Sequence, residues 1–186
     1  MNKIDLKEAI HLSHQLANMV RRDFVPDVII TIKNGGVLPG VEISEKLDKP
    51  LLEIDIRRII DDKFEKKYSK ASEDVKKEIS KDFNKAWFAT EPKIVKTDRL
   101  DLKDKKVLLV DDAVHTGKTL NAAKAYISTF KPSLVKTATL FYADKYVPDY
   151  VLGRGEKQYP WSTWAKFNEG YKVYEEYLKK HERALS

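Results

Sequence analysis

Residues 107–120 read Val-Leu-Leu-Val-Asp-Asp-Ala-Val-His-Thr-Gly-Lys-Thr-Leu. Four apolar residues in a row, two of them β-branched, predict a strand that is buried on both faces. Asp111 and Asp112 follow where this strand would end, and residues 116–119 form a hydroxyl-rich turn that opens onto a helical pattern. The free N–H groups of such a turn and the dipole of the helix favour a bound anion. The stretch therefore predicts a phosphate site with ligands for a polyol or a metal beside it.

Gly117-Lys118-Thr119 also has the letters that end a Walker A loop. That loop needs another glycine five residues before Gly117, where this chain has Asp112. A carboxylate in a loop that wraps a triphosphate would repel the ligand, which excludes the Walker loop. A plain buried strand with a solvated turn and a helix cap is the remaining alternative, but it requires neither the acid pair nor the hydroxyl-rich turn.

The stretch 111–119 resembles the phosphoribosyl-pyrophosphate (PRPP) signature of type I phosphoribosyltransferases. The resemblance implies that Asp111 and Asp112 hold the ribose hydroxyls, directly or through Mg²⁺, and that residues 115–119 cradle the 5′-phosphate. The residues expected to line the PRPP site are Asp111, Asp112, Ala113, Val114, His115, Thr116, Gly117, Lys118 and Thr119.

The composition predicts an ordinary folded domain. With 186 residues and 42% hydrophobic content the chain can bury a real core, and we expect one domain over residues 1–186. It has no cysteine, no apolar run of about 18 residues and no signal-peptide pattern, so we expect a cytoplasmic protein with no membrane partner. The net charge of +6 is spread among 29 acidic residues, which favours a solvated surface and a phosphate-rich substrate over a nucleic-acid partner.

Alternating strand and helix patterns predict the fold. Apolar runs predict strands over residues 28–32, 50–56, 107–110, 135–142 and 148–152. Helices are predicted from a capping box at residues 5–8, over residues 39–47, from residue 120 to about 130 and at the end of the chain. This order is typical of an α/β fold with a doubly wound, mainly parallel five-stranded sheet flanked by helices. Ligands of such a sheet bind at the carboxyl ends of its strands.

Two basic segments lie where the first strands would end. Paired glycines in Lys33-Asn34-Gly35-Gly36 let a backbone approach a ligand closely, although a plain strand-to-helix turn is the alternative. In the family that the chain resembles, this loop binds pyrophosphate. The resemblance therefore implies pyrophosphate contacts from Lys33, Asn34, Gly35 and Gly36. Arg57 or Arg58 would add a second pyrophosphate contact, with Arg57 as the chosen candidate, and solvated charges are the alternative.

Residues 59–99 are an insertion relative to the resembling family. Apolar residues recur at helical spacing: Phe64, Tyr68, Ala71, Val75, Ile79, Phe83 and Trp87. Residues 88–90 and 94–95, on either side of Glu91-Pro92, predict a short hairpin. In the family this region contains the loop that closes over the active site, so the insertion would form a lid or a dimer contact.

The last third of the chain is similar to the 6-oxopurine branch of the family. The similarity rests on residues 148–150 and 159–161, and it makes residues 143–186 a base-binding hood with a C-terminal helix. That helix has an aromatic and apolar stripe at Trp164, Phe167, Tyr171, Tyr174 and Leu178, with Ser162 or Thr163 as its cap. An aromatic stripe of this kind is usually core packing.

The base end of the site departs from that branch. His115 stands where the branch has an aspartate that is its proposed general acid/base, and imidazole can take that role. Tyr142, Asp144 and Lys145 are the candidates to read the base edge. Asp144 would favour a 6-amino group, and Lys145 would favour a 6-oxo group. Tyr159 and Trp161 are the candidates to stack on the base, with plain packing as the alternative.

The resemblance thus implies a purine phosphoribosyltransferase of nucleotide salvage. Its catalytic residues would be Lys33, Asp112 and His115, its metal ligands Asp111 and Asp112, and its cofactor Mg²⁺. Its partners would be PRPP, a purine base and a nucleoside monophosphate, in a homodimer or homotetramer. An adenine enzyme and a non-catalytic sensor of PRPP or nucleotides are the alternatives.

Overall fold

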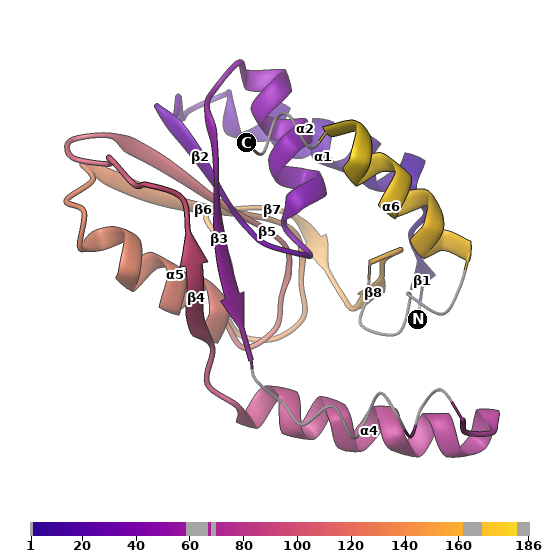
Figure 1. The fold of residues 1–186 in the computed structure, drawn as a ribbon. Coiled ribbons are helices and arrows are strands. Elements are labelled where there is room, and N and C mark those ends of the chain that lie inside the picture. The colour runs from indigo at the N-terminus through magenta and orange to yellow at the C-terminus, as the bar shows by residue number, and fades with distance from the viewer. Residues whose placement is uncertain (1, 59–66, 68–69, 162–168, 182–186) are drawn as a thin grey trace.

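The computed structural model describes residues 2–58, 67, 70–161 and 169–181. A six-stranded sheet forms its centre, with the strand order β4-β3-β2-β5-β6-β7 (Figure 1). The strands are β2 (Val28–Ile32), β3 (Leu51–Arg57), β4 (Lys93–Thr97), β5 (Lys106–Val114), β6 (Leu134–Tyr142) and β7 (Tyr150–Arg154). All pairs are parallel except β3–β4. The predicted doubly wound α/β fold is confirmed, but the sheet has six strands, because β4 adds an antiparallel edge to the five that were predicted.

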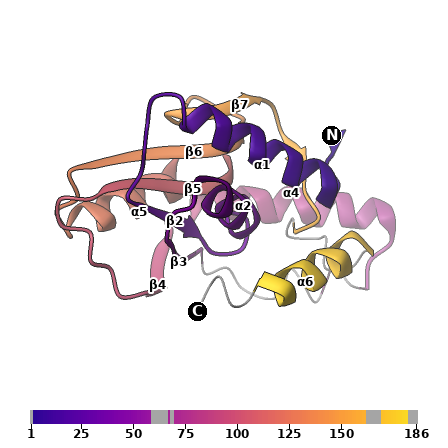
Figure 2. The ribbon, with the colours of Figure 1, turned by 90° about the horizontal axis from the view of Figure 1, so that it is seen from above.

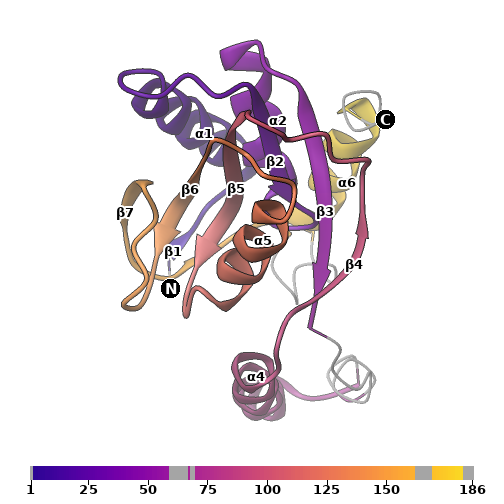
Figure 3. The same ribbon diagram turned by 90° about the vertical axis from the view of Figure 1, so that its left-hand side faces the viewer.

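Helices cover both faces of this sheet (Figure 3). On one face α1 (Leu6–Val20), α2 (Val37–Leu47) and α6 (Glu169–His181) enclose a core, and on the other α5 (Lys118–Ser128) encloses a second. Every residue of β2 is buried, as an apolar run between two helical layers requires. The Asp5 side chain accepts a 2.7 Å hydrogen bond from the Glu8 backbone and caps α1 as predicted.

The insertion contains one described helix, α4 (Glu73–Ala89), which lies beyond the carboxyl end of β3 (Figure 1). Seen from above, α4 lies on the side away from the viewer, partly behind α1 (Figure 2). The predicted hairpin over residues 88–95 is wrong. Ala89 ends α4, Thr90 caps it through a 2.8 Å bond to the Ala86 carbonyl, and β4 pairs with β3 instead. Phe64 and Tyr68 lie outside the described residues.

The C-terminal part of the chain folds back over the first core. The described helix α6 buries Tyr174 and Tyr177, while Leu178 is partly buried. The predicted cap at Ser162 or Thr163 and the stripe residues Trp164 and Phe167 lie outside the described residues. A small parallel pair that the sequence did not indicate joins β1 (Asn2–Lys3) to β8 (Lys157–Gln158).

Parallel pairing brings four chain segments to one edge of the sheet. These are residues 33–36 after β2, Arg58 after β3, residues 111–119 around the end of β5, and residues 143–149 after β6. This edge is where a doubly wound sheet binds its ligands. None of the described helices combines the length and the apolar character that a bilayer crossing requires.

Candidate active site

The acid pair ends the central strand of the sheet. Asp111 is 9% exposed, and one of its carboxylate oxygens accepts a 2.9 Å hydrogen bond from the backbone of Asp112. The Asp112 carboxylate accepts a 2.7 Å bond from the backbone of Ala113. Burial raises the pKa of both carboxyls, and the neighbouring Asp112 raises that of Asp111 further. The unliganded site thus disfavours negative charge on these two acids, and a cation or a hydroxyl donor bound there would stabilise their ionised form.

The loop after β5 has the conformation of an anion cradle. Gly117 has a φ of 76° and forms the N-cap of α5, where no side chain caps the helix. A Cβ at this position would lie 2.2 Å from the Tyr146 ring, so only glycine fits between the helix and that ring. The backbone N–H of Lys118 faces the Thr116 hydroxyl at 3.5 Å. The amino end of α5 thus presents a glycine N-cap and the Thr116 hydroxyl, where the helix dipole would favour an anion.

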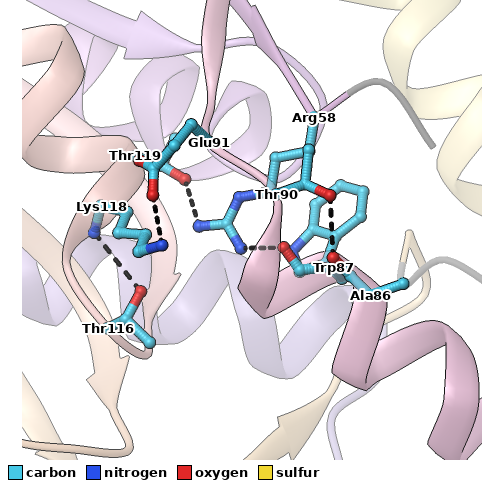
Figure 4. Close-up of polar contacts among 8 residues, drawn as sticks. All are labelled: Arg58, Ala86, Trp87, Thr90, Glu91, Thr116, Lys118 and Thr119. Atoms are coloured by element: carbon cyan, nitrogen blue, oxygen red, sulfur yellow. Dashed lines mark hydrogen bonds and ion pairs between the residues drawn. The ribbon is translucent and has the colours of Figure 1, made fainter.

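Arg58 connects the insertion to this loop (Figure 4). Its side chain is buried and donates to the Trp87 carbonyl at 2.8 Å and to the Thr119 hydroxyl at 3.2 Å. The guanidinium lies 5.4 Å from the centre of the Trp87 ring. Burial lowers the pKa of Arg58, and its buried Nε has no hydrogen-bond partner in the described part of the chain.

A second contact between the insertion and the loop pairs Lys118 with Glu91, just beyond α4 (Figure 4). Glu91 is 27 residues away from Lys118 in the chain. The ammonium group of Lys118 is thus paired with a carboxylate. Lys118 belongs to residues 115–119, the predicted 5′-phosphate site, which we call the phosphate loop. Nothing in the local sequence of residue 91 indicated this role, because the pairing depends on where α4 ends.

The loop after β2 touches the acid pair. Gly35 packs against the Asp112 side chain so closely that a Cβ would lie 2.5 Å from the carboxylate. Asn34 adopts a left-handed φ of 74°, and the Lys33 ammonium lies 3.1 Å from the Glu53 carboxylate. The predicted pyrophosphate loop and the predicted ribose acids are therefore neighbours.

An open pocket of about 300 Å³ adjoins this loop. It is lined by Asn34, Ile56, Arg57, Arg58 and Trp87. Arg57 is held by two hydrogen bonds of 2.8 and 2.6 Å to the Asp55 carboxylate, which lowers the pKa of Asp55. Both arginines line the pocket, but only Arg58 also reaches the phosphate loop.

The residues predicted to contact the base lie in two places. Tyr142, Asp144 and Lys145 lie at the carboxyl end of β6, near His115, whereas Tyr159 and Trp161 are buried. The Nε2 atom of His115 lies 3.0 Å from the Glu156 carboxylate, and Tyr142 lies under the Arg154 guanidinium at 6.0 Å. Asp144 and Lys145 are exposed on the turn after β6. Sequence reasoning missed Glu156, whose only signal is its position close to the glycines of residues 153–155.

Tyr159 and Trp161 are buried rather than open to solvent. Their rings stack at a centroid distance of 4.9 Å, and Trp161 packs at 5.0 Å against Tyr174 of α6. The indole N–H of Trp161 donates a 2.5 Å hydrogen bond to the Asp112 carboxylate. The Tyr174 hydroxyl donates to the Asn34 carbonyl at 3.0 Å. The base-stacking role of the two residues stays a prediction.

A family model for the phosphoribosyl transferase domain matches residues 3–176. The chain belongs to this family. A solved purine phosphoribosyltransferase from Pyrococcus horikoshii is 28% identical, with a TM-score of 0.65 over 88% of this chain and 94% of that one. A xanthine-guanine-hypoxanthine phosphoribosyltransferase from Helicobacter pylori shares the fold, with a TM-score of 0.61 and 18% identity over 89% of this chain and 96% of that one.

Curated relatives match parts of this phosphoribosyltransferase chain. The bifunctional protein PyrR of Pediococcus pentosaceus is 32% identical over 124 residues, which are 61% of this chain and 57% of that protein. The bifunctional protein PyrR of Clostridium kluyveri is 43% identical over 51 residues, which are 27% of this chain and 29% of that protein. The matched segments thus span less than two thirds of these relatives.

The residues at the acid pair fit a magnesium ion that phosphoribosyltransferases generally use with PRPP. No group of three or more histidine, cysteine or acidic ligands occurs in the part of the chain that the structure describes. Mg²⁺ is commonly held by one or two carboxylates together with substrate oxygens, so Asp111 and Asp112 would be the residues to hold it.

Proposed function

We propose that this phosphoribosyltransferase transfers the 5-phosphoribosyl group of PRPP to a purine nitrogen, with a 6-oxopurine as the favoured base. The products are a nucleoside 5′-monophosphate and pyrophosphate. The observation that supports this most directly is the contact of Gly35 with the Asp112 carboxylate at the edge where Gly117 opens α5. One site thereby offers a phosphate cradle, acids for a ribose and a basic loop for pyrophosphate.

PRPP would bind across these three parts. The 5′-phosphate accepts from the N–H groups and hydroxyls of residues 115–119, where the helix dipole also favours negative charge. Asp111 and Asp112 accept from the ribose hydroxyls. Anchoring the ligand at groups remote from C1 orients the reacting carbon and lowers the entropic part of the barrier.

Loss of pyrophosphate builds positive charge on C1 of the ribose and negative charge on the leaving oxygen. Lys33, with Arg57 or Arg58 at the adjoining pocket, would stabilise the negative charge. Mg²⁺, when bound at the acid pair, supplies further neutralisation of that charge.

His115 would accept the proton that the purine loses as its nitrogen bonds to C1. The 3.0 Å contact with Glu156 supports this role, because a carboxylate on one ring nitrogen holds the ring in a fixed orientation. The other ring nitrogen is then the one that exchanges a proton with the base. His115 and Glu156 thus form the proposed acid/base pair.

The choice of a purine draws on the Pyrococcus purine phosphoribosyltransferase, which matches most of the chain. Asp144 and Lys145 share one exposed turn, so an acceptor for a 6-amino group and a donor for a 6-oxo group are both present. Assays with PRPP and Mg²⁺ against adenine, hypoxanthine, guanine and xanthine in parallel test the proposal. Turnover of one or more 6-oxopurines is expected. Turnover of adenine alone would show that the chain is an adenine phosphoribosyltransferase. No nucleotide formation with any of the four bases would contradict the proposal of a purine substrate.

A sensor of PRPP or nucleotides is the second candidate function. The Lys118–Glu91 and Arg58–Thr119 contacts favour it, because a phosphate that binds at the loop must act on the insertion too. The likeness to the PyrR proteins, which are described as bifunctional, is in keeping with a second role. A sensor would bind PRPP in calorimetry and form no nucleotide with any base.

Cytoplasmic purine salvage by a homodimer or homotetramer stays a prediction. Light scattering of the purified chain measures its assembly directly. A monomeric mass would contradict the predicted oligomer without affecting the proposed reaction.

A further inference from the structure

Both oxygens of the Asp112 carboxylate are engaged by donors from the chain. One accepts from the Ala113 backbone at 2.7 Å, and the other accepts from the indole N–H of Trp161 at 2.5 Å. Gly35 lies against the same carboxylate. The neighbouring Asp111 side chain also hydrogen-bonds to this carboxylate. A carboxylate has about four lone-pair positions, so a ligand can use only what these contacts leave open. The bonds to Ala113 and Trp161 therefore set the direction from which a ligand hydroxyl can donate to Asp112.

Trp161 is itself held in place by its neighbours. Its ring lies between the rings of Tyr159, at 4.9 Å and 14°, and Tyr174, at 5.0 Å and 43°. It is 9% exposed, so the indole cannot turn without repacking this group. The Tyr174 hydroxyl in turn donates to the Asn34 carbonyl in the loop after β2. The three rings, which we name the aromatic column, thus fix an acid and a loop of the active site together.

We propose that Trp161 is a positioning residue, whose N–H holds the Asp112 carboxylate in the orientation that receives the ribose of PRPP. This inference rests on the proposed function, because it assigns Asp112 to the ribose. A neutral donor on a carboxylate makes a strong hydrogen bond that leaves the negative charge in place. Holding the acid before the ligand arrives removes the cost of ordering it in the complex.

The Trp161→Phe variant removes the N–H and keeps an aromatic ring in the column. The expected result is a rise of about tenfold or more in the KM for PRPP, since hydrogen bonds to charged groups contribute that much. The KM for the purine should change less than about twofold, because the indole N–H faces the acid pair. Calorimetry, which does not depend on turnover, should show a rise in the Kd for PRPP of the same size as the rise in the KM.

Tyr177→Phe is the matched control for a merely structural effect. Tyr177 stands next to the column, 6.5 Å from Tyr174, and donates a 2.9 Å hydrogen bond to Glu42. No described contact joins it to Asp112 or to residues 33–36. Its loss should lower the melting temperature and leave the KM for PRPP unchanged. An equal rise in that KM in both variants would show that packing alone is responsible and would overturn the proposal.

A fluorescence measurement covers the case in which Trp161→Phe does not fold. The chain has three tryptophans, so the double variant Trp87→Phe, Trp164→Phe leaves Trp161 as its only indole. Once calorimetry has shown that this variant binds PRPP, the addition of PRPP should change the Trp161 emission, because the acid that accepts its N–H acquires new donors. An unchanged emission spectrum would overturn the proposal.

The outcomes separate this inference from the proposed function. A wild-type chain that forms nucleotide, beside a Trp161→Phe variant with an unchanged KM for PRPP, overturns the inference alone. A wild-type chain that neither binds PRPP nor forms nucleotide overturns the proposed function and the inference with it.

Discussion

Arg58 and Thr119 lie 61 residues apart in the chain and are joined by a 3.2 Å hydrogen bond from the guanidinium to the hydroxyl. The same guanidinium donates to the Trp87 carbonyl at the end of α4. One buried cation therefore holds the end of β3, the helix α4 and the amino end of α5 together.

Arg58→Lys should destabilise the chain and weaken PRPP binding. Lysine keeps the charge but lacks the planar fork that reaches Trp87 and Thr119 together. We expect a loss of about 1–2 kcal/mol in the free energy of unfolding and a higher KM for PRPP. Denaturant unfolding and initial-rate kinetics measure both. Arg99→Lys, at an exposed arginine, is the control and should stay within about 0.5 kcal/mol of wild type. Equal stabilities of the two variants would contradict the anchoring role of Arg58.

Glu91→Gln should strengthen PRPP binding. The carboxylate competes with the 5′-phosphate for the Lys118 ammonium, and glutamine removes that competition. Because the pair is partly exposed, the expected fall in the KM for PRPP is about two- to fivefold, and it should shrink at high salt. Asp101→Asn, which breaks a surface pair with Lys105, is the control and should leave the KM unchanged. A higher KM in Glu91→Gln would show that the pair supports binding instead.

Gly117→Ala should impair the phosphate loop. The left-handed φ of 76° is unfavourable for alanine, and the new methyl group would meet the Tyr146 ring. We expect a loss of about 1–2 kcal/mol in stability and a marked fall in kcat/KM for PRPP. Gly153→Ala is the milder counterpart, since its Cβ would lie 3.4 Å from the Phe141 ring. Comparable defects in the two variants would argue against a special role of the Gly117 conformation.

Asp111→Asn should stabilise the unliganded chain at neutral pH while abolishing turnover. Burial beside Asp112 raises the pKa of Asp111, so the folded chain keeps this proton at pH values where the unfolded chain has lost it. Stability therefore falls as the pH rises from the ordinary carboxyl pKa toward the raised one, and asparagine, which imitates the protonated acid, avoids that loss. Melting temperatures of the variant and wild type should converge as the pH falls toward about 3.

Asp55→Asn is the control, for which a change in stability of the opposite sign is expected. Hydrogen bonds from Arg57 lower the pKa of Asp55, so its ionised form stabilises the fold above the ordinary carboxyl pKa. This variant should be less stable than wild type at neutral pH, and the difference should vanish as the pH falls through the lowered pKa. A less stable Asp111→Asn variant at neutral pH would contradict the assignment of a raised pKa.

The sequence predicted the parallel part of the sheet because its strands are apolar runs buried on both faces, as Val28–Ile32 is. The sequence analysis paired the segment of β4 with residues 88–90, whereas the structure pairs it with β3. The periodicity of a short segment does not identify a distant partner strand. Phe88 and Ala89 have strand-forming neighbours in the sequence, yet the helical hydrogen bonds of α4 continue through them.

Site residues that belong to a local sequence motif could be proposed from the sequence. The choice between neighbouring candidates was left open where it depends on tertiary packing. Residues 111–119 and 33–36 were predicted to lie at the ends of two buried strands, and the structure places them at the ends of β5 and β2. Their binding of phosphate and pyrophosphate stays a prediction. Arg57 and Arg58 are neighbours, and which of them turns toward the phosphate loop depends on how β3 ends. Trp161 was a candidate to stack on the base, with plain packing as the alternative, and its stacking role stays a prediction. Its contact with Asp112 could not be predicted, because α6, from a later part of the chain, packs against it.

The balance of products tests the proposed reaction most directly. The chain is mixed with PRPP, Mg²⁺ and a 6-oxopurine, and nucleoside monophosphate and pyrophosphate are quantified together by chromatography. We predict equal amounts of the two products from the wild-type chain and neither from the Asp111→Asn, Asp112→Asn double variant. Pyrophosphate without nucleotide, or equal product formation by the double variant, would contradict transfer at this acid pair.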